Sequence, residues 1–143
     1  MRLLVNDMRI SKRRARKEAV SNGYRSKFEY TFAKRLEELK LKARYESEKI
    51  HFIQPEKKRT YIPDWTIRRN VYVETKGRFT AADRQKILWV RQQNPKTTVY
   101  MLFQNSKVTL SKVSKTTYAD WCDKNGIIWA DIKDEDRWKD WFK

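Results

Sequence analysis

The chain has 143 residues, of which 34 are Lys or Arg and 18 are Asp or Glu, so its formal net charge at pH 7 is +16. Such an excess of positive charge favours a polyanionic partner. The 13% aromatic content and six tryptophans exclude a purely disordered basic tail, because these side chains can form a core. The length fits one domain of ordinary size.

The rarest residues and the apolar runs exclude further classes. One cysteine, Cys122, and one histidine, His51, are too few for a zinc site, a Cys–His nucleophilic pair or an intrachain disulfide. A reducing compartment is therefore expected. No apolar run approaches the roughly 20 residues that cross a bilayer. The opening MRLLVNDMRI lacks the apolar core and cleavage site of a signal peptide, so neither membrane insertion nor secretion is expected.

Residues 1–22 form a first compositional unit, a basic N-terminal arm that contains the run SKRRARKEA. We expect this arm to contact nucleic-acid phosphates through Arg13, Arg14 and Lys17. The alternative is a solvated, partly helical tail that only keeps the chain soluble.

The folded part is expected over residues 23–143, and Gly23 marks its start. The segment SKFEYTFAKRLEELKLKA predicts a helix, because its apolar residues recur at helical spacing. These residues are Phe28, Phe32, Leu36 and Leu39. Ser26 followed by Glu29 matches a capping box, so Glu29 has a structural explanation that needs no catalysis.

A weaker pattern follows this helix. RYESEKIHFI alternates as a strand would, and QPEKKRTYIP reads as a basic connector between Pro55 and Pro63. The connector supplies three candidate phosphate contacts, Lys57, Lys58 and Arg59.

The next segment holds the most informative pattern, Asp64 in IPDW and then Glu74 and Lys76 in VYVETKG. Side chains of a strand alternate between faces, so Glu74 and Lys76 share one face. WTIRRN predicts the preceding strand, and a tight reversal at Arg69–Asn70 would place Asp64 beside Glu74 in an antiparallel hairpin.

Two carboxylates and an ammonium group in one small space suit phosphodiester cleavage. Mg²⁺ is typically held by one or two carboxylates, with other positions left for phosphate and water. Lys76 can orient the attacking water or stabilise charge in the transition state. The alternative is a solvated hairpin in which Glu74 and Lys76 form an ordinary ion pair.

The remainder of the chain alternates between helices and strands. TAADRQKILWVRQQN predicts a helix with a cap at Thr80 and Asp83, and TTVYMLFQN predicts a buried strand. The loop SKVTLSKVSK supplies candidate phosphate contacts at Lys107, Lys112 and Lys115. Thr117 and Asp120 predict the cap of a helix that contains Cys122 and ends at Gly126. A last short strand, IIWADI, precedes the amphipathic tail DEDRWKDWFK.

Several segments together carry a family resemblance. They are GYRSKFEYTFAKRLE, TYIPDW, VYVETKG, DRQKILWVRQQNP and TTYADWCDKNGI, in one order over about residues 24–131. The chain resembles the phage-type endonuclease I family of Holliday-junction resolvases, which has a PD-(D/E)xK site.

This resemblance implies an α/β fold, a restriction-endonuclease-like mixed sheet flanked by helices, with residues 23–143 as the nuclease domain. It implies Mg²⁺-dependent hydrolysis of branched DNA, above all four-way junctions, and Mn²⁺ is expected to substitute. It also implies an intracellular phage or prophage protein that acts in the cytoplasm of a bacterial host.

The resemblance also assigns residues. It implies that Asp64 and Glu74 bind metal, with Thr75 contributing its backbone carbonyl, and that Lys76 is the catalytic lysine. Glu29 would complete the site, acting in trans in an intertwined homodimer whose bridge is the segment from about Tyr45 to Arg59. The family has a further glutamate where this chain has Arg44, with Glu46 nearby. Either Glu46 substitutes for that glutamate or the role is absent.

Two other functions stay open on the sequence alone. One is a related Mg²⁺-dependent nuclease that acts on duplex DNA or RNA. The other is a non-catalytic basic protein that only binds nucleic acid, for which the charge would be the whole function.

Overall fold

The computed structural model describes residues 16–54 and 57–143. The chain divides into two units, Met1–Leu41 and Lys42–Lys143, and each is described by itself. In the described part of the first unit, residues 16–21 are helical, Gly23 turns the chain with a φ of +85°, and α2 spans Lys27–Glu38. The helix predicted after Gly23 is therefore confirmed.

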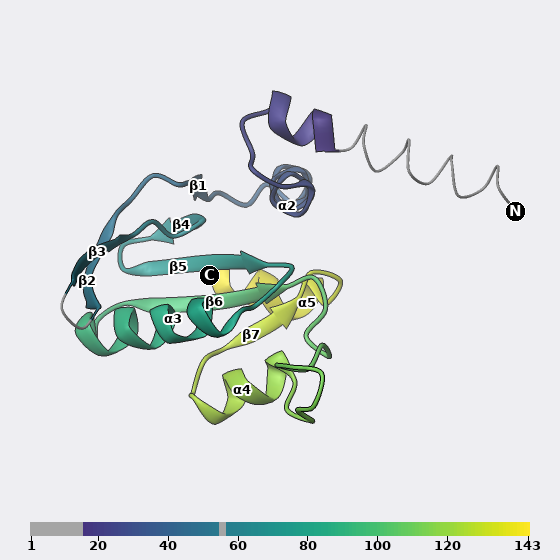
Figure 1. Ribbon diagram of the computed structural model, residues 1–143. Helices are drawn as coiled ribbons and strands as arrows, with labels where there is room; N and C mark the ends of the chain where they lie inside the picture. Colours follow the sequence, from purple (N-terminus) through teal and green to yellow (C-terminus); the bar gives the residue numbers. More distant parts are fainter. Residues whose placement is uncertain (1–15, 55–56) are drawn as a thin grey trace, which may run out of the picture. The chain divides into compact units, whose positions relative to one another are not determined.

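The second unit is built on one five-stranded sheet with the order β1-β4-β5-β6-β7 (Figure 1). The strands are β1 Arg44–Tyr45, β4 Trp65–Arg68, β5 Val71–Lys76, β6 Thr98–Phe103 and β7 Trp129–Asp131. Pairing is antiparallel from β1 through β4 to β5, and parallel from β5 through β6 to β7. The mixed sheet expected from the sequence is confirmed.

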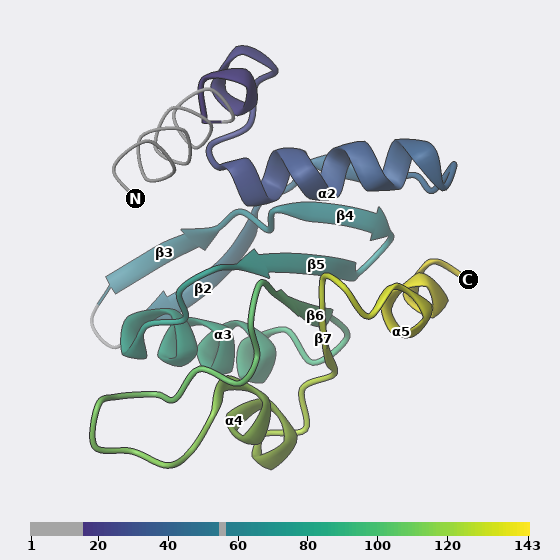
Figure 2. The same ribbon diagram turned by 90° about the vertical axis from the view of Figure 1, so that its right-hand side faces the viewer.

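Helices connect the parallel strands and cover both faces of this sheet (Figures 1 and 2). The crossover between β5 and β6 is α3, Ala81–Gln93, and the crossover between β6 and β7 contains α4, Tyr118–Lys124. Ile87 and Val90 of α3 share a core with Met101 of β6. On the other face lie α5, Glu135–Lys139, and the 3-10 helix η1, Asp140–Phe142. There Trp141 stacks on Tyr100 with ring centroids 4.6 Å apart.

A separate two-stranded sheet consists of β2, Ile50–Gln54, and β3, Lys57–Tyr61. The two strands pair antiparallel, and Ile50, Phe52 and Tyr61 join the core that also contains the buried residues of α3. The expectation of a basic connector is therefore wrong for residues 57–61, which form a strand. Four of these five residues are polar and exposed, so only Tyr61 shows the apolar signal of a strand.

The helix caps predicted from short sequence patterns agree well with the structure. The capping boxes at Thr80–Asp83 and Thr117–Asp120 are both present with both hydrogen bonds. Ser26 accepts from the backbone N–H of Glu29 at 3.1 Å, as the pattern before α2 predicts. Gly126 follows α4 with a φ of +66°, a conformation that glycine adopts at little cost.

Within residues 16–54 and 57–143, no helix combines the length and the apolar character that a bilayer crossing requires.

Candidate active site

The β4–β5 hairpin positions the predicted cluster. Asn70, with a φ of +61°, forms the reversal between the strands, and Trp65 pairs with Val73. Asp64 directly precedes this pair and Glu74 directly follows it, so the two residues lie side by side. The backbone N–H of Asp64 accordingly donates to Oε2 of Glu74 at 3.3 Å. The predicted hairpin is confirmed, with a bulge between Thr66 and Arg68 that the sequence did not indicate.

The Asp64 carboxylate is buried and oriented by Thr75. Its Oδ2 accepts from the Thr75 backbone N–H at 3.0 Å and from the Thr75 hydroxyl at 2.8 Å. The side chain of Asp64 is therefore fixed by the same strand that carries Glu74 and Lys76. Such fixed orientation is what a carboxylate needs to present an oxygen to a metal ion.

The Glu74 carboxylate is also buried, with 3% of the residue exposed. Its Oε2 accepts from the Tyr61 hydroxyl in addition to the Asp64 N–H. Burial raises the pKa of Glu74 above its usual value, although the Lys76 ammonium and these hydrogen bonds oppose the rise. A positive charge placed at this carboxylate would relieve the burial penalty.

Lys76 lies between two carboxylates. Its Nζ is 3.6 Å from Oε1 of Glu74 and 3.4 Å from Oδ1 of Asp83. Burial lowers the pKa of Lys76, but the attraction of Glu74 and Asp83 is stronger, so the net shift is upward. Lys76 is therefore a cation at neutral pH, suited to donating hydrogen bonds and stabilising negative charge rather than to accepting a proton.

Sequence reasoning missed three contributors to this cluster. Tyr61 reaches Glu74 from β3, Asp83 holds Lys76 as well as capping α3, and Lys86 places its Nζ 5.5 Å from the centre of the Tyr61 ring. The spacing of Asp83 and Lys86, three residues apart on one helix, could have suggested a shared face. Tyr61 gave no such signal, because its strand was not recognised.

The other predicted residues are spread over both units. Glu29 lies in α2 of the first unit, where its Oε2 accepts from the Arg25 backbone N–H at 3.0 Å. Arg13 and Arg14 fall outside the described residues. The remaining basic candidates have exposed side chains, and they are Lys17, Lys57, Lys58, Arg59, Lys107, Lys112 and Lys115.

Arg44 and Glu46 occupy the place where the family pattern fails. The Arg44 guanidinium pairs with Glu48 at 2.8 Å. Glu46 adopts a φ of +44°, and its backbone N–H donates to the Asp64 carbonyl at 2.9 Å. Glu46 is thus the acidic residue whose backbone adjoins Asp64, whereas Arg44 is engaged elsewhere.

Asp64 and Glu74 offer oxygen ligands of the kind that Mg²⁺ prefers, and burial makes a compensating cation favourable. The donor set therefore fits such an ion. Asp64 and Glu74 are two ligands. Among residues 16–54 and 57–143, the structure brings together no larger group, of three or more His, Cys, Asp and Glu side chains, that could hold a metal ion.

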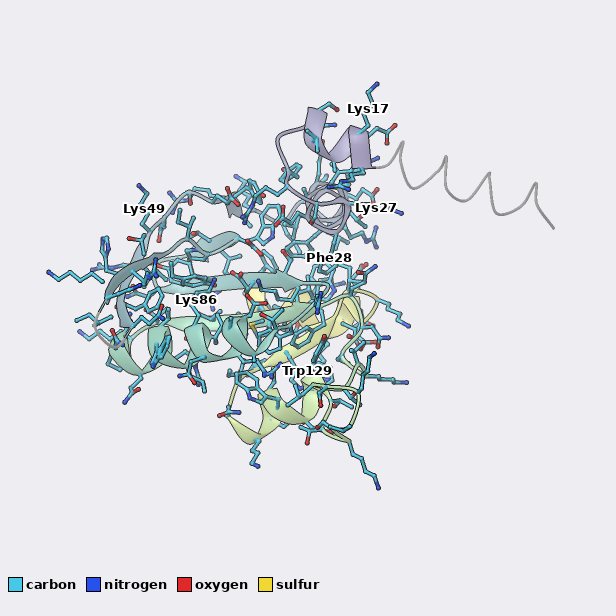
Figure 3. All side chains as sticks on the ribbon, in the orientation of Figure 1. Lys17, Lys27, Phe28, Lys49, Lys86 and Trp129 are labelled. Atoms are coloured by element: carbon cyan, nitrogen blue, oxygen red, sulfur yellow. The ribbon has the colours of Figure 1, made fainter. Side chains whose placement is uncertain are left out.

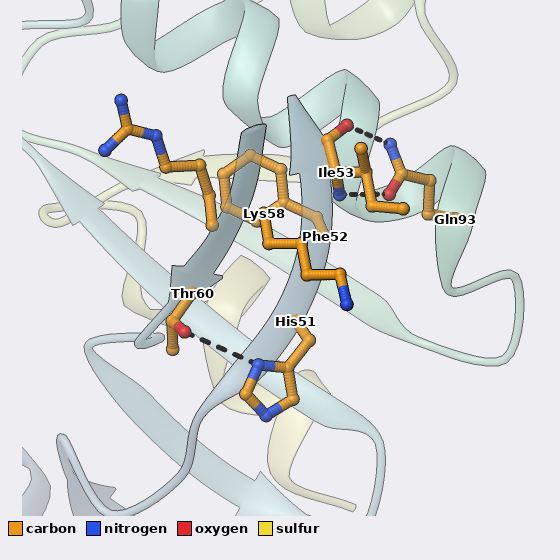
Figure 4. Close-up of a pocket in the computed structure, with 7 residues that line it drawn as sticks. His51, Phe52, Ile53, Lys58, Thr60 and Gln93 are labelled. Carbon is orange, nitrogen blue, oxygen red and sulfur yellow. Dashed lines mark hydrogen bonds between the residues drawn. The ribbon is translucent and has the colours of Figure 1, made fainter. Parts of the chain in front are cut away.

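A cavity of about 520 Å³ lies on the β2–β3 hairpin and does not include the carboxylates (Figure 4). Two contacts close parts of its wall: Thr60 lies 3.4 Å from Nδ1 of His51, and the Gln93 amide bonds both backbone groups of Ile53. The residues that line this cavity are therefore different from the predicted site residues Asp64, Glu74 and Lys76.

Comparisons with known proteins show which proteins the chain is similar to. The family profile of phage endonuclease I matches residues 9–138. Endodeoxyribonuclease 1 of Enterobacteria phage T3 is 37% identical over 108 residues, which cover 76% of this chain and 71% of that protein. Endonuclease I of Escherichia phage T7 is also 37% identical over 108 residues, covering 76% of this chain and 72% of that protein.

Proposed function

Because the chain belongs to the phage endonuclease I family, and is therefore a nuclease that acts on DNA, we propose that it is a Mg²⁺-dependent, structure-selective endonuclease. Its substrate is branched DNA, and it resolves four-way junctions by paired nicks. The observation that carries this proposal is the cluster of Asp64, Glu74 and Lys76, in which two buried carboxylates lie beside a lysine held as a cation.

Each residue of the cluster has a role in this proposal. Asp64 and Glu74, with the Thr75 backbone carbonyl, would hold Mg²⁺, and Mn²⁺ is expected to substitute. When bound, the ion would polarise the scissile phosphate and lower the pKa of water. Lys76 donates to the attacking water or to a phosphate oxygen, where its charge offsets the charge that develops in the transition state. Tyr61 and Thr75 hold the two carboxylates in orientation.

We place the remaining acidic ligand on Glu29 of a second copy of the chain. Asp64 and Glu74 supply two carboxylates, and the resemblance to the family implies that a glutamate of the first helix supplies a third from the partner chain. A homodimer would then carry two sites, which is what paired nicks on opposite strands require. Doubling a charge of +16 also suits a substrate bound mainly through phosphates.

The test is cleavage of an end-labelled four-way junction with Mg²⁺, with the wild type beside Asp64→Asn and Lys76→Ala. Products are resolved on native and denaturing gels, and duplex DNA, single-stranded DNA and RNA of the same sequence run in parallel. We expect paired symmetric nicks in the junction, little cleavage of the duplex, and no cleavage by Asp64→Asn despite retained junction binding.

Other outcomes separate the alternatives. Equal cleavage of junction and duplex, or cleavage of RNA, would leave the metal site in place but replace the proposed substrate. Absence of hydrolysis with both Mg²⁺ and Mn²⁺ would overturn the catalytic proposal.

A further inference from the structure

A second cavity, of about 400 Å³, adjoins the catalytic cluster. It lies between the β2–β3 hairpin and the first turns of α3. Its lining residues are Phe52, Gln54, Arg59, Thr60, Ala82, Asp83, Gln85, Lys86 and Trp89. Unlike the cavity in Figure 4, it includes side chains that also act on the cluster.

Two residues link this cavity to the predicted reaction centre. Asp83 lines the cavity and lies 3.4 Å from Nζ of Lys76. Lys86, a residue of α3 that is labelled in Figure 3, also lines the cavity. Its Nζ lies over the ring of Tyr61, and its charge favours the charged form of Glu74. A phosphodiester bond at the cluster would therefore have its neighbouring nucleotide within reach of the cavity.

The lining combines three kinds of group that can bind a nucleotide. Trp89 provides a half-buried aromatic surface that packs on the buried Phe52, with ring centroids 6.5 Å apart and planes at 24°. Aromatic surfaces of this kind accept any base by stacking. Arg59 and Lys86 supply two cations for phosphate, and two glutamines supply amides that can hydrogen-bond to any of the bases. The volume lies within the range of small-ligand sites.

We propose that this cavity takes one unstacked nucleotide next to the cleaved phosphodiester bond. The inference rests on the proposed function and gives it a selection step. In a continuous duplex the base must leave its stack to enter the cavity, whereas at a branch point stacking and pairing are already interrupted. The cavity therefore favours branched DNA over intact duplex without reading sequence.

The test is a double-mutant cycle between DNA and protein. It removes one base of the junction and one side chain of the cavity, separately and together. Four-way junctions carry a single abasic nucleotide, moved one position at a time from the branch into each arm. Affinity is measured by competition without divalent metal, so that cleavage does not interfere. The proteins are full-length wild type, Gln85→Ala, Trp89→Ala and, as matched control, Gln92→Ala. Gln92 is exposed on the same helix but does not line the cavity.

At one position beside the cleaved bond, we expect base removal to weaken wild-type binding about five-fold or more, the lower end of measured base–aromatic stacking. Gln85→Ala and Trp89→Ala should reduce that dependence on the base, and Gln92→Ala should retain it. Gln85 is exposed, so its variant keeps the fold even if Trp89→Ala does not. The cost of unstacking is common to all four proteins and cancels in the comparison.

A second pair of variants separates base capture from general attraction to phosphate. Arg59→Gln and Lys57→Gln remove one charge each from the same strand, but only Arg59 lines the cavity. We expect Arg59→Gln to reduce the preference for junction over duplex more than Lys57→Gln does.

The inference is overturned if the wild type cleaves junctions as proposed, yet base removal changes the affinity of wild type, Gln85→Ala and Trp89→Ala equally at every position. Equal loss of junction preference in Arg59→Gln and Lys57→Gln would also count against it. A wild type that cleaves no junction would instead refute the proposed function.

Discussion

At Glu74, burial and hydrogen bonding move the pKa in opposite directions, and burial is the stronger. The Tyr61 hydroxyl matters because it donates to the charged carboxylate and fixes which oxygen remains for other partners. Tyr61 itself is fully enclosed, and burial together with the Glu74 charge raises its pKa well above the usual value. The hydroxyl therefore stays protonated and remains a donor.

Tyr61→Phe should weaken the response to metal while keeping the fold. Loss of the donor leaves Glu74 less well oriented, and losses of this kind typically reduce metal affinity or activity by about 10-fold or more. The measurement is the Mg²⁺ concentration at half-maximal cleavage. Tyr72→Phe is the matched control, because its hydroxyl bonds Glu48 instead. An unchanged Mg²⁺ response in Tyr61→Phe would contradict this assignment.

The burial of Cys122 should make the folded protein less stable at alkaline pH. The thiol is buried, and burial raises its pKa to about 12. In the unfolded chain it ionises near pH 8.5, so its stabilising contribution is complete below that pH and is lost as pH rises towards 12. The free energy of unfolding should fall by about 1.4 kcal/mol per pH unit above 8.5 through this group.

Cys122→Ala removes that contribution to the pH dependence. The substitution also loses packing contacts, and this loss should be the same at each pH. Only the wild type loses stability through the thiol as the pH rises. The difference in free energy of unfolding between wild type and variant, measured with denaturant, should therefore narrow from pH 7 to pH 10. A constant gap would show that Cys122 does not titrate differently in the two states.

At the scale of elements, the N-terminal cap of α3 contacts the cluster of Asp64, Glu74 and Lys76. Asp83 accepts from the Thr80 backbone N–H at 3.1 Å and pairs with Lys76 at 3.4 Å. Lys76 and the Thr80 hydrogen bonds lower the pKa of Asp83 against the effect of burial. One carboxylate therefore both begins the helix and holds the lysine.

The two roles can be separated by substitution. Thr80→Ala should lower the free energy of unfolding by about 1 kcal/mol and retain cleavage, because the Asp83–Lys76 pair persists. Asp83→Asn should keep most of the stability, since an amide oxygen can still accept from Thr80, but slow cleavage because Lys76 loses a charged partner. Thr117→Ala, in the equivalent box of α4, is the control. Equal cleavage rates in Asp83→Asn and wild type would refute the link.

The elements also show what the sequence can and cannot predict. Helix starts such as Thr80–Asp83 depend on contacts within four residues, and the β4–β5 hairpin depends on period-two alternation, so both could be predicted. Strand β3 could not, because pairing with β2 and one buried residue, Tyr61, define it. Asp64, Glu74 and Lys76 lie in or beside one hairpin, so their proximity could be predicted from the sequence, whereas the contact between Tyr61 and Glu74 depends on tertiary structure.

At the scale of the whole molecule, the proposed homodimer predicts that Glu29 of one chain acts with Asp64 of its partner. Glu29 belongs to the first unit and Asp64 to the second. Neither composition nor local periodicity distinguishes a site completed within one chain from a site completed by a partner. Completion of the site by a partner chain is therefore a prediction of the proposed homodimer.

Complementation between two inactive variants tests it. Glu29→Gln and Asp64→Asn chains, each inactive alone, are co-expressed so that mixed dimers form. If Glu29 acts in trans, one site of the mixed dimer combines native Asp64 with native Glu29 from its partner, and the junction is nicked once instead of twice. If Glu29 acts in cis, every site contains a substitution. No cleavage by purified mixed dimers would therefore refute action in trans.

The burial of Glu74 should lower the thermal stability of the protein. A carboxylate with a raised pKa destabilises the native state at neutral pH, because the unfolded chain carries the same charge more easily in water. Glu74→Gln, which keeps the shape and removes the charge, should therefore melt at a higher temperature than the wild type while losing cleavage. We expect the difference in melting temperature to measure the stability that the wild type gives up by burying this charge.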